Sequence, residues 1–316
     1  MKVVFMGTPQ FAVPSLEAVS KIGEELIGVV TQPDRPKGRG ERIASSPVKD
    51  WAVAKCIPVY QPIKVRDPEF LKQLRDLSPD LIVVVAFGQI LPKALLEIPR
   101  KGCVNVHASL LPKFRGAAPI NWALIQGERE TGVTTMLMDQ GMDTGPILLQ
   151  ERVQIEPYDT AETLAERLQL IGAELLVRTI AELKAGRLKP KAQNSSQATM
   201  APLLKKEDGL IQWDQPAEAI VDRVRGLVPW PGAYTFNGLE RWQLWKVSAL
   251  DMPSKRATPG EVLEVQKDGV LVAAADKAIR IEELQPENKR RMKVRDYLAG
   301  NSLKAGTFLS NEKAAK

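Results

Sequence analysis

Residues 81–85 read Leu-Ile-Val-Val-Val, an unbroken apolar run that is followed by Ala-Phe-Gly. Continuous rather than alternating hydrophobicity is typical of a strand that is buried on both faces of a parallel sheet. Three more β-branched runs have the same texture, at residues 3–6, 26–30 and 104–106. Helical patterns lie between these runs, for example over residues 15–22 and 67–77. This alternation predicts an α/β domain with a Rossmann-like, doubly wound, mostly parallel sheet.

A long helix is predicted over residues 159–185. Asp159 and Glu162 have the spacing of a capping box, and Gly186 is placed to end the helix. The polar stretch that follows, residues 190–206, has no periodicity and contains three lysines but no acidic residue. We expect it to be a basic interdomain linker, and its linker lysines are Lys191, Lys205 and Lys206.

The chain beyond residue 206 has a different texture. One helical pattern, at residues 216–225, precedes four short strand-like runs at residues 242–247, 261–265, 270–274 and 279–284. Regularly spaced short strands predict a small β-barrel of the oligonucleotide-binding (OB) type. We therefore expect a catalytic domain at residues 1–189, the linker at 190–206 and a C-terminal OB-like domain at 207–316.

Length and composition agree with a two-domain globular protein. The chain has 316 residues, of which 44% are hydrophobic and 26% charged, and no apolar run is long enough for a membrane helix. The apolar run at the N-terminus is too short for a secretory signal. Two cysteines cannot form a disulfide framework, and no Cys/His pair has zinc spacing. We expect a cytoplasmic protein without a bound metal.

The charge balance permits a polyanionic partner without proving one. The formal net charge is +6 and the sequence pI is about 9.2.

The turn Gly7-Thr8-Pro9 lacks the second and third glycines of the dinucleotide fingerprint, which disfavours a nicotinamide-dependent dehydrogenase.

The chain has one histidine, His107, two residues after Asn105 in a predicted strand. Strand side chains alternate, so both residues project to the same face. A Pro/Gly-bearing loop follows at the carboxyl end of that strand, where doubly wound sheets bind ligands. Asp139 and Asp143 lie in a second turn-rich loop, after a strand expected at residues 133–138.

An imidazole, a carboxamide and a carboxylate on converging loops suit acyl transfer, because the amide stabilises an oxyanion while the other two move a proton. A lone histidine is also common as a hydrogen-bond partner, and Asp-Gly turns often have a purely conformational role. The residues alone leave both interpretations open.

Several motifs together resemble one enzyme family, the 10-formyltetrahydrofolate-dependent formyltransferases. They are Asn105-Val106-His107, Ser109-Leu110-Leu111-Pro112, Arg115-Gly116-Ala117-Ala118-Pro119-Ile120 and Asp139-Gln140-Gly141-Met142-Asp143-Thr144-Gly145. The stretches at residues 7–14 and 226–234 are similar to the branch of the family whose acceptor is methionyl initiator tRNA. The resemblance covers essentially the whole chain.

The resemblance implies that the α-amine of methionine on initiator tRNA attacks the formyl carbon of 10-formyltetrahydrofolate. The product is the N-formylmethionyl-tRNA that starts translation. Asn105 and protonated His107 would hold the oxygen of the tetrahedral intermediate, and Asp143 would relay the proton. No obligate protein partner is evident, and we expect a monomer.

The resemblance also implies where folate binds. It places the folate against Ser109, Leu110, Leu111 and Pro112. It places the pterin near Gly88, Gln89, Ile90 and Leu91, although these residues also fit an ordinary strand end.

A basic Gly/Pro segment follows the predicted strand at residues 26–30, and its cations are Arg35, Lys37, Arg39 and Arg42. Such a segment is usually a solvated surface loop. The resemblance implies that it binds the acceptor end of tRNA, with Arg39 as the principal contact. The linker lysines and a basic run in the second domain (Lys289, Arg290 and Arg291) would extend a track of phosphate contacts.

Two alternative functions stay open. The first is a formyltransferase of the same fold that acts on a small amine, either a purine-precursor ribonucleotide or an amino-sugar nucleotide. The second domain and the basic segment argue against the purine enzyme more than against the amino-sugar enzyme. A catalytically inert tRNA-binding module is a different class, but it leaves Asn105, His107 and Asp143 without a role.

Overall fold

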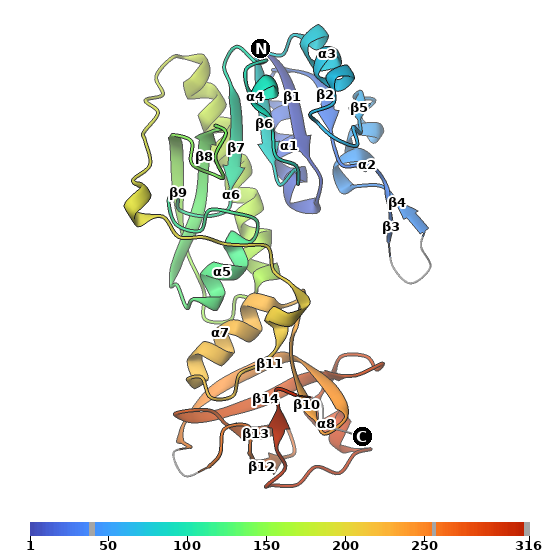
Figure 1. The fold of residues 1–316 in the computed structure, drawn as a ribbon, viewed down its shortest axis with the longest axis vertical. Helices are drawn as coiled ribbons and strands as arrows, with labels where there is room; N and C mark the ends of the chain where they lie inside the picture. Colours follow the sequence, from blue (N-terminus) through green and yellow to red (C-terminus); the bar gives the residue numbers. More distant parts are fainter. Residues whose placement is uncertain (38–41, 255–256, 313–316) are drawn as a thin grey trace. The chain divides into compact units, whose positions relative to one another are not determined.

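The computed structural model describes residues 1–37, 42–254 and 257–312 (Figure 1). By spatial contacts the chain forms two compact units. Unit 1 consists of Met1–Pro119, Glu130–Gln154 and Ala165–Ala201, and unit 2 consists of Ile120–Arg129, Ile155–Leu164 and Pro202–Lys316. The domain limits expected from the sequence, 1–189, 190–206 and 207–316, stay a prediction.

Unit 1 contains a seven-stranded sheet with the order β5-β2-β1-β6-β7-β8-β9. The strands are β1 (Lys2–Gly7), β2 (Glu25–Val30), β5 (Val59–Tyr60), β6 (Leu81–Val85), β7 (Cys103–His107), β8 (Glu130–Leu137) and β9 (Ile147–Gln154). The pairs from β5 to β7 are parallel, and β8 and β9 add two antiparallel pairs. The predicted Rossmann-like, mostly parallel sheet is confirmed, because the apolar runs at residues 3–6, 26–30, 81–85 and 104–106 form its central strands.

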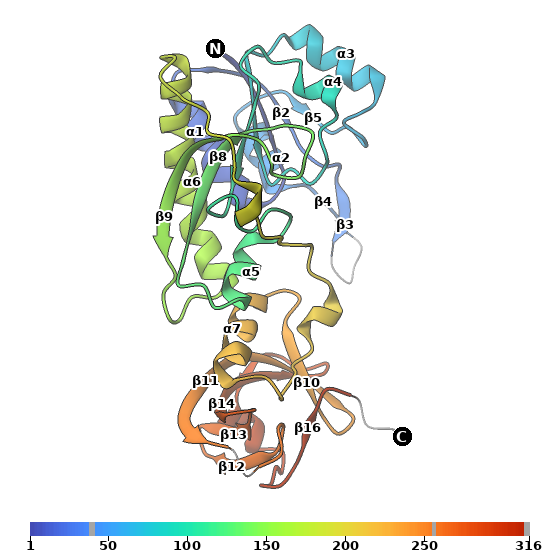
Figure 2. The same cartoon turned by 60° about the vertical axis from the view of Figure 1, so that its left-hand side comes forward.

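Helices cover both faces of this sheet, with α1 and α6 on one face and α3 and α4 on the other (Figure 2). The helices of unit 1 are α1 (Val13–Lys21), α2 (Pro47–Ala54), α3 (Pro68–Leu77), α4 (Lys93–Leu96) and, apart from its first turn, α6 (Ala161–Lys184), with a 3-10 turn η1 (Gln10–Ala12) before α1. Helix α5 (Pro119–Ile125) belongs to unit 2 except for its first residue. Phe70 and Leu74 of α3 pack with Met6 and Ile82 of the sheet in one buried cluster. On the opposite face α6 approaches β7 so closely that a Cβ at Gly172 would lie 3.1 Å from Val106 Cγ1.

The start of α6 differs from the expected capping box. Thr160 and Thr163 cap each other: the Thr163 N–H donates to Thr160 Oγ1 at 3.3 Å, and the Thr160 N–H donates to Thr163 Oγ1 at 3.0 Å. Asp159 accepts instead from Thr163 Oγ1 and from the Glu156 N–H. Gly186 ends the helix as predicted, with φ +68° and its N–H bonded to the Leu183 carbonyl.

Unit 2 contains an antiparallel sheet with the order β12-β13-β14-β11-β10-β16. Its strands are β10 (Ala233–Asn237), β11 (Glu240–Pro253), β12 (Val262–Gln266), β13 (Gly269–Ala273), β14 (Lys277–Pro286) and β16 (Leu309–Ser310), and β15 (Met292–Lys293) pairs with β14. The two edges meet, because the Val262 N–H donates to the Thr307 carbonyl at 2.7 Å and the Leu309 N–H to the Gly260 carbonyl at 2.8 Å. The sheet is therefore curled into a small barrel-like structure, as expected. Helices α7 (Ala217–Leu227) and α8 (Val294–Leu298) accompany it.

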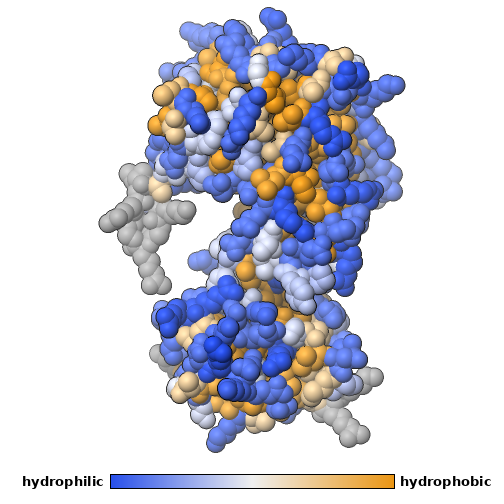
Figure 3. Space-filling model, turned by 180° about the vertical axis from the view of Figure 1, so that it is seen from behind, coloured by the Kyte–Doolittle hydropathy of each residue, from blue (hydrophilic) through white to orange (hydrophobic). Residues whose placement is uncertain are grey.

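Within the described ranges, no helix combines the length and the apolar character that crossing a membrane requires. On the face of unit 1 shown in Figure 3, hydrophobic residues are interspersed with hydrophilic ones.

Candidate active site

The topology of the sheet places the candidate site at the carboxyl ends of β1, β6 and β7. β1 pairs with β2 on one side and with β6 on the other, so the direction of the chain connections reverses there. Ligands of doubly wound sheets bind at such a switch point. The loop after β7 starts at this edge, and so does the loop after β6.

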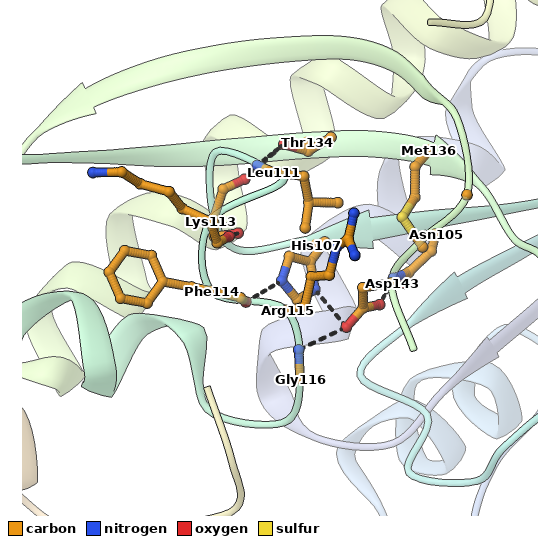
Figure 4. A network of polar contacts seen from close by, with 12 residues as sticks. Asn105, His107, Leu111, Lys113, Phe114, Arg115, Gly116, Thr134, Met136 and Asp143 are labelled. Carbon is orange, nitrogen blue, oxygen red and sulfur yellow. Dashed lines mark hydrogen bonds and ion pairs between the residues drawn. The ribbon is translucent and has the colours of Figure 1, made fainter. Parts of the chain in front are cut away.

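Asn105 and His107 lie on the same face of β7, and Asp143 comes to them from the loop that follows β8 (Figure 4). Asn105 Nδ2 donates to Asp143 Oδ1 at 3.4 Å, and His107 Nδ1 lies 3.7 Å from Asp143 Oδ2. The exposed fraction is 6% for the His107 side chain and 15% for the Asp143 side chain. The three residues that the sequence singled out therefore converge in a largely buried position.

The loop after β7 supplies two more contacts to this cluster. His107 Nε2 lies 2.9 Å from the carbonyl of Phe114, and the Gly116 N–H donates to Asp143 Oδ2 at 2.9 Å. A carbonyl only accepts, so Nε2 carries the proton in this contact. The imidazole is thus fixed on one side by a short bond, and its Nδ1 side faces the carboxylate at a longer distance.

The loop that carries Asp143 is shaped by its own motif. Asp139 Oδ1 accepts from the Gly141 N–H at 3.0 Å and from Thr144 Oγ1 at 2.7 Å. A Cβ at Gly145 would lie 1.8 Å from the Leu137 carbonyl oxygen, so no larger residue fits there. Asp143 itself has φ +54°, a left-handed conformation that aspartate tolerates better than most residues.

Buried hydrogen bonds hold the segment Ser109–Pro112 against β8. Thr134 Oγ1 donates to the Ser109 carbonyl at 2.6 Å and accepts from the Leu111 N–H at 3.2 Å. Ser109 Oγ donates to the Lys113 carbonyl at 2.6 Å. The side chains of Ser109 and Leu111 are buried, whereas Leu110 and Pro112 are half-buried. Only these last two side chains offer surface to a ligand, and folate binding by the segment stays a prediction.

The predicted pterin segment, residues 88–91, follows β6. Gln89 accepts from the Val65 N–H at 2.9 Å, and Leu91 is buried in the core cluster, so these two side chains have structural roles. Ile90 is 83% exposed, and Gly88 has φ +87°. Gly88 and Ile90 are accordingly the members of the segment that are free to contact a ligand.

The basic segment forms a hairpin of β3 (Arg35–Lys37) and β4 (Arg42–Ala44). Arg39 lies outside the described residues, and only the backbones of Lys37 and Arg42 are described. Arg35 is exposed, and its Nη2 donates to Gln32 Oε1 at 3.2 Å. Gln32 Nε2 in turn donates to the Phe87 carbonyl at 3.2 Å, so the base of the hairpin adjoins the loop after β6.

An ion pair and an amide fix the base of the hairpin on its other side. Asp34 accepts from Lys49 Nζ at 2.5 Å and from Gln61 Nε2 at 2.7 Å. These hydrogen bonds hold the pKa of the Asp34 carboxyl below its usual value. The residue before the hairpin is therefore tied to α2 through Lys49 and to the residue after β5 through Gln61.

The remaining predicted cations are exposed, but they differ in their contacts. The linker lysines have exposed side chains, and so do all members of the basic run in unit 2. Arg291 already pairs with Glu283 at 2.7 Å and stacks on the Trp245 ring at 4.6 Å. Arg291 is therefore less free to meet a phosphate than Lys289 or Arg290.

Two residues that support the site, Arg115 and Gln193, were not predicted as site residues, although Arg115 belongs to one of the motifs on which the resemblance rests. Arg115 Nη2 donates to Gln193 Oε1 at 2.8 Å, and Gln193 Nε2 donates to the Asp143 carbonyl at 2.8 Å. Gln193 lies in the stretch that was expected to be a linker. Its polar neighbourhood has no periodicity, so the sequence held no signal for this contact.

Two further findings concern reactive groups. Burial raises the pKa of the Cys103 thiol in β7 to about 12, which keeps this cysteine protonated. Among the described residues, no group of three or more His, Cys, Asp or Glu side chains is arranged to hold a metal ion.

Both units match known domains. Residues 1–180 match the family described as formyl transferase, and residues 203–302 match the formyl transferase C-terminal domain. The methionyl-tRNA formyltransferase of Geobacter metallireducens is 51% identical over 98% of this chain and 99% of its own. That of Clostridioides difficile is 48% identical over 98% of this chain and 100% of its own.

Solved structures share the fold. An N-formyltransferase from Helicobacter canadensis, crystallised with folinic acid and dTDP-3-aminofucose, has a TM-score of 0.69 at 19% identity and covers 89% of this chain and 99% of that chain. A phosphoribosylglycinamide formyltransferase from Bacillus halodurans has a TM-score of 0.50 at 28% identity and covers 58% of this chain and 95% of that chain. Since similarity at about half identity extends over nearly the whole length and both domains match, the chain belongs to the formyl transferase family, among the methionyl-tRNA formyltransferases.

Proposed function

We propose that this enzyme transfers the formyl group of 10-formyltetrahydrofolate to the α-amine of methionyl initiator tRNA. The observation that carries this proposal is the convergence of Asn105, His107 and Asp143 at the carboxyl edge of the sheet in a chain of this family. Relatives that share about half of the sequence over their full length act on methionyl-tRNA by name. The product, N-formylmethionyl-tRNA, serves the initiation of translation.

The reaction requires one new bond, one broken bond and one proton transfer. The amine nitrogen attacks the formyl carbon and gives a tetrahedral intermediate with an oxyanion. The bond between this carbon and N10 of the folate then breaks, while a proton leaves the amine nitrogen and another arrives at N10. The products are the formylated amine and tetrahydrofolate.

The residue roles follow from the lengths of the contacts. We assign the oxyanion to the Asn105 amide and to the Nδ1–H of protonated His107, because their contacts with Asp143, at 3.4 Å and 3.7 Å, are longer than good hydrogen bonds. The Nε2 side is held at 2.9 Å by Phe114 and is not available. Asp143 is assigned the proton of the attacking amine, because its carboxylate is a basic group in contact with both Asn105 and His107.

The folate is assigned to the two loops beside this cluster. Leu110 and Pro112 are the half-buried side chains of one loop, and Ile90 is the exposed apolar side chain of the other. Apolar surface of this kind packs against a flat ring, while exposed backbone groups around Gly88 bind its polar edge. The remaining predicted folate residues (Ser109, Leu111, Gln89 and Leu91) act by shaping these loops.

The acceptor end of the tRNA is assigned to the hairpin of β3 and β4. Its base is tied to the loop after β6 through Arg35, Gln32 and the Phe87 carbonyl. The cations of the hairpin (Arg35, Lys37, Arg39 and Arg42) would therefore meet the tRNA near the site of chemistry, with Arg39 as the principal contact. Unit 2, with its barrel-like sheet and basic run, would hold the tRNA body through phosphate contacts.

Parallel formylation assays test the proposal. The protein is incubated with 10-formyltetrahydrofolate and, separately, with charged initiator tRNA, an amino-sugar nucleotide and glycinamide ribonucleotide. Rapid formylation of the tRNA alone is expected. Preference for a small amine would overturn the tRNA assignment, and binding of tRNA without turnover would indicate an inert module. The purine alternative is already weakened, because that relative's match covers only 58% of this chain.

We further propose that the enzyme is a cytoplasmic monomer, because formylation of initiator tRNA serves translation and the residues assigned to the chemistry all come from one chain. Light scattering during size-exclusion chromatography should give the mass of one chain, 34.9 kDa. A mass of two chains would refute this assignment.

A further inference from the structure

One glutamine far along the chain contacts the backbone of Asp143 and of a residue just after it. Gln193 Nε2 donates to the Asp143 carbonyl at 2.8 Å and to the Gly145 carbonyl at 2.7 Å. Both acceptors lie in the short loop after β8, on either side of Thr144. A single amide group therefore spans the segment that carries the carboxylate.

The orientation of this amide is set by Arg115. Its Nε and Nη2 donate to Gln193 Oε1 at 3.1 Å and 2.8 Å, and an arginine has no acceptor to offer in return. The oxygen of the amide must face Arg115, so its NH₂ group must face the two carbonyls. Arg115 is only 7% exposed, and among the described residues it forms no ion pair with a carboxylate. The guanidinium group of Arg115 thus uses two of its donors, Nε and Nη2, on the Gln193 amide oxygen.

Backbone hydrogen bonds fasten the segment around Gln193 to the loop after β7. The Arg115 N–H donates to the Thr199 carbonyl at 2.8 Å, and the Ala201 N–H donates to the Arg115 carbonyl at 2.7 Å. Lys191 exchanges two backbone hydrogen bonds of 2.8 Å with Ile147, the first residue of β9. Gln193 is therefore held between two anchored points and does not lie on a free strand of chain.

This anchoring matters because Asp143 occupies a sparsely populated backbone conformation. A non-glycine residue at φ +54° persists only where its surroundings impose that conformation. The contacts of its carboxylate with Asn105 and His107 are long, and they do not fix the backbone. The carboxylate has one short contact, with the Gly116 N–H at 2.9 Å, whereas the backbone of this turn is held by the short hydrogen bonds from Gln193 to the carbonyls of Asp143 and Gly145.

We propose that Gln193, oriented by Arg115, is a positioning residue for formyl transfer that holds the Asp143 carboxylate against Asn105 and His107. The inference rests on the proposed function for its kinetic consequence, but the geometry that it describes can be tested without any substrate. Gln193→Glu keeps the size and the acceptor for Arg115 but replaces the donor by an oxygen that repels both carbonyls. Gln193→Met removes donor and acceptor alike. Gln197→Glu is the matched control, because Gln197 lies in the same segment and its side chain is exposed.

The first test uses the only histidine of the chain as a reporter. The imidazole Cε1–H resonance of His107 is followed by NMR at one fixed pH, with Asp143→Ala as the reference for a lost carboxylate. Gln193→Glu and Gln193→Met should move the resonance toward its position in Asp143→Ala, and Gln197→Glu should leave it at the parent position. Resonances of both Gln193 variants that coincide with the parent's would overturn the proposal, whatever the enzyme's acceptor proves to be.

The second test is kinetic and asks whether Gln193 acts through Asp143. Gln193→Met should lower kcat roughly 10- to 100-fold, which is the effect of a small misplacement of a reacting group, with little change in the KM for folate. In the Asp143→Ala background the same substitution should change kcat less than about twofold, because its target is gone. Effects that multiply in the double variant would overturn the proposal. If the parent does not formylate methionyl-tRNA, the proposed function fails, and the NMR result still decides the role of Gln193.

Discussion

Replacing Asp143 by asparagine removes one negative charge and keeps the size of the side chain and its tolerance of a left-handed backbone. In the site, the carboxylate accepts from the Gly116 N–H at 2.9 Å and from Asn105 Nδ2 at 3.4 Å. An asparagine offers one acceptor oxygen in place of two, so one of these donors must lose its partner. The substitution thus separates the charge of Asp143 from its shape.

The expected loss of activity is larger than the expected loss of stability. A donor left without a partner costs about 1–3 kcal/mol, and the shorter bond, to Gly116, is the one we expect the asparagine to keep. Removing a group that stabilises charge or moves a proton in the transition state lowers the rate by roughly 10²- to 10⁴-fold. At 1.36 kcal/mol for each factor of ten, that is about 2.7–5.4 kcal/mol of transition-state stabilisation.

The assay compares kcat for formylation of charged initiator tRNA with the free energy of unfolding from urea denaturation. We expect a two to four order-of-magnitude fall in kcat for Asp143→Asn and for His107→Ala, with the KM for folate changed much less. Asp76→Asn, on an exposed position of α3, is the control for loss of one carboxylate. A folded Asp143→Asn or His107→Ala variant with nearly normal turnover would refute the assigned mechanism.

Three other predictions concern separate parts of the chain. Arg39→Ala should raise the KM for charged tRNA and leave folate binding unchanged, and tRNA kinetics equal to the parent's would contradict the contact. Neutralising the linker lysines and the basic run should flatten the dependence of log K on log salt by roughly 0.7–0.9 per lost phosphate contact, with discrimination between initiator and elongator tRNA retained; an unchanged slope would make them solvated surface charges. At pH 8 a thiol reagent should label exposed Cys56 and spare Cys103, whose pKa of about 12 leaves almost no thiolate until the pH approaches that value, and two fast-reacting thiols in the native protein would disprove this.

The sequence was most informative where burial leaves a regular pattern. Strands β6 and β7 lie at the centre of the sheet with both faces covered, so their apolar runs are continuous and predict a parallel sheet directly. β9 (Ile147–Gln154) left no such pattern, because it is an edge strand whose second half alternates exposed and half-buried positions. The cap that Thr160 and Thr163 form at the start of α6 was missed for a different reason. Both this pair and the pair Asp159 and Glu162 are three residues apart, so the spacing of a capping box fits either pair.

The residues of the candidate site also differ in whether a local sequence pattern predicts them. Asn105 and His107 were predicted to share a face because residues two apart in one strand do so, and both contact Asp143. Gln193 has no such local relation to its partners: Arg115 comes from the loop after β7, and Asp143 and Gly145 come from the loop after β8. Gln193 can make these contacts only after folding has brought its own segment next to the two loops. The hydrophobic periodicity of each segment taken alone therefore could not predict them. A polar stretch without periodicity can therefore be an anchored support for an active site, and in this chain the supposed linker contains the residue that holds Asp143.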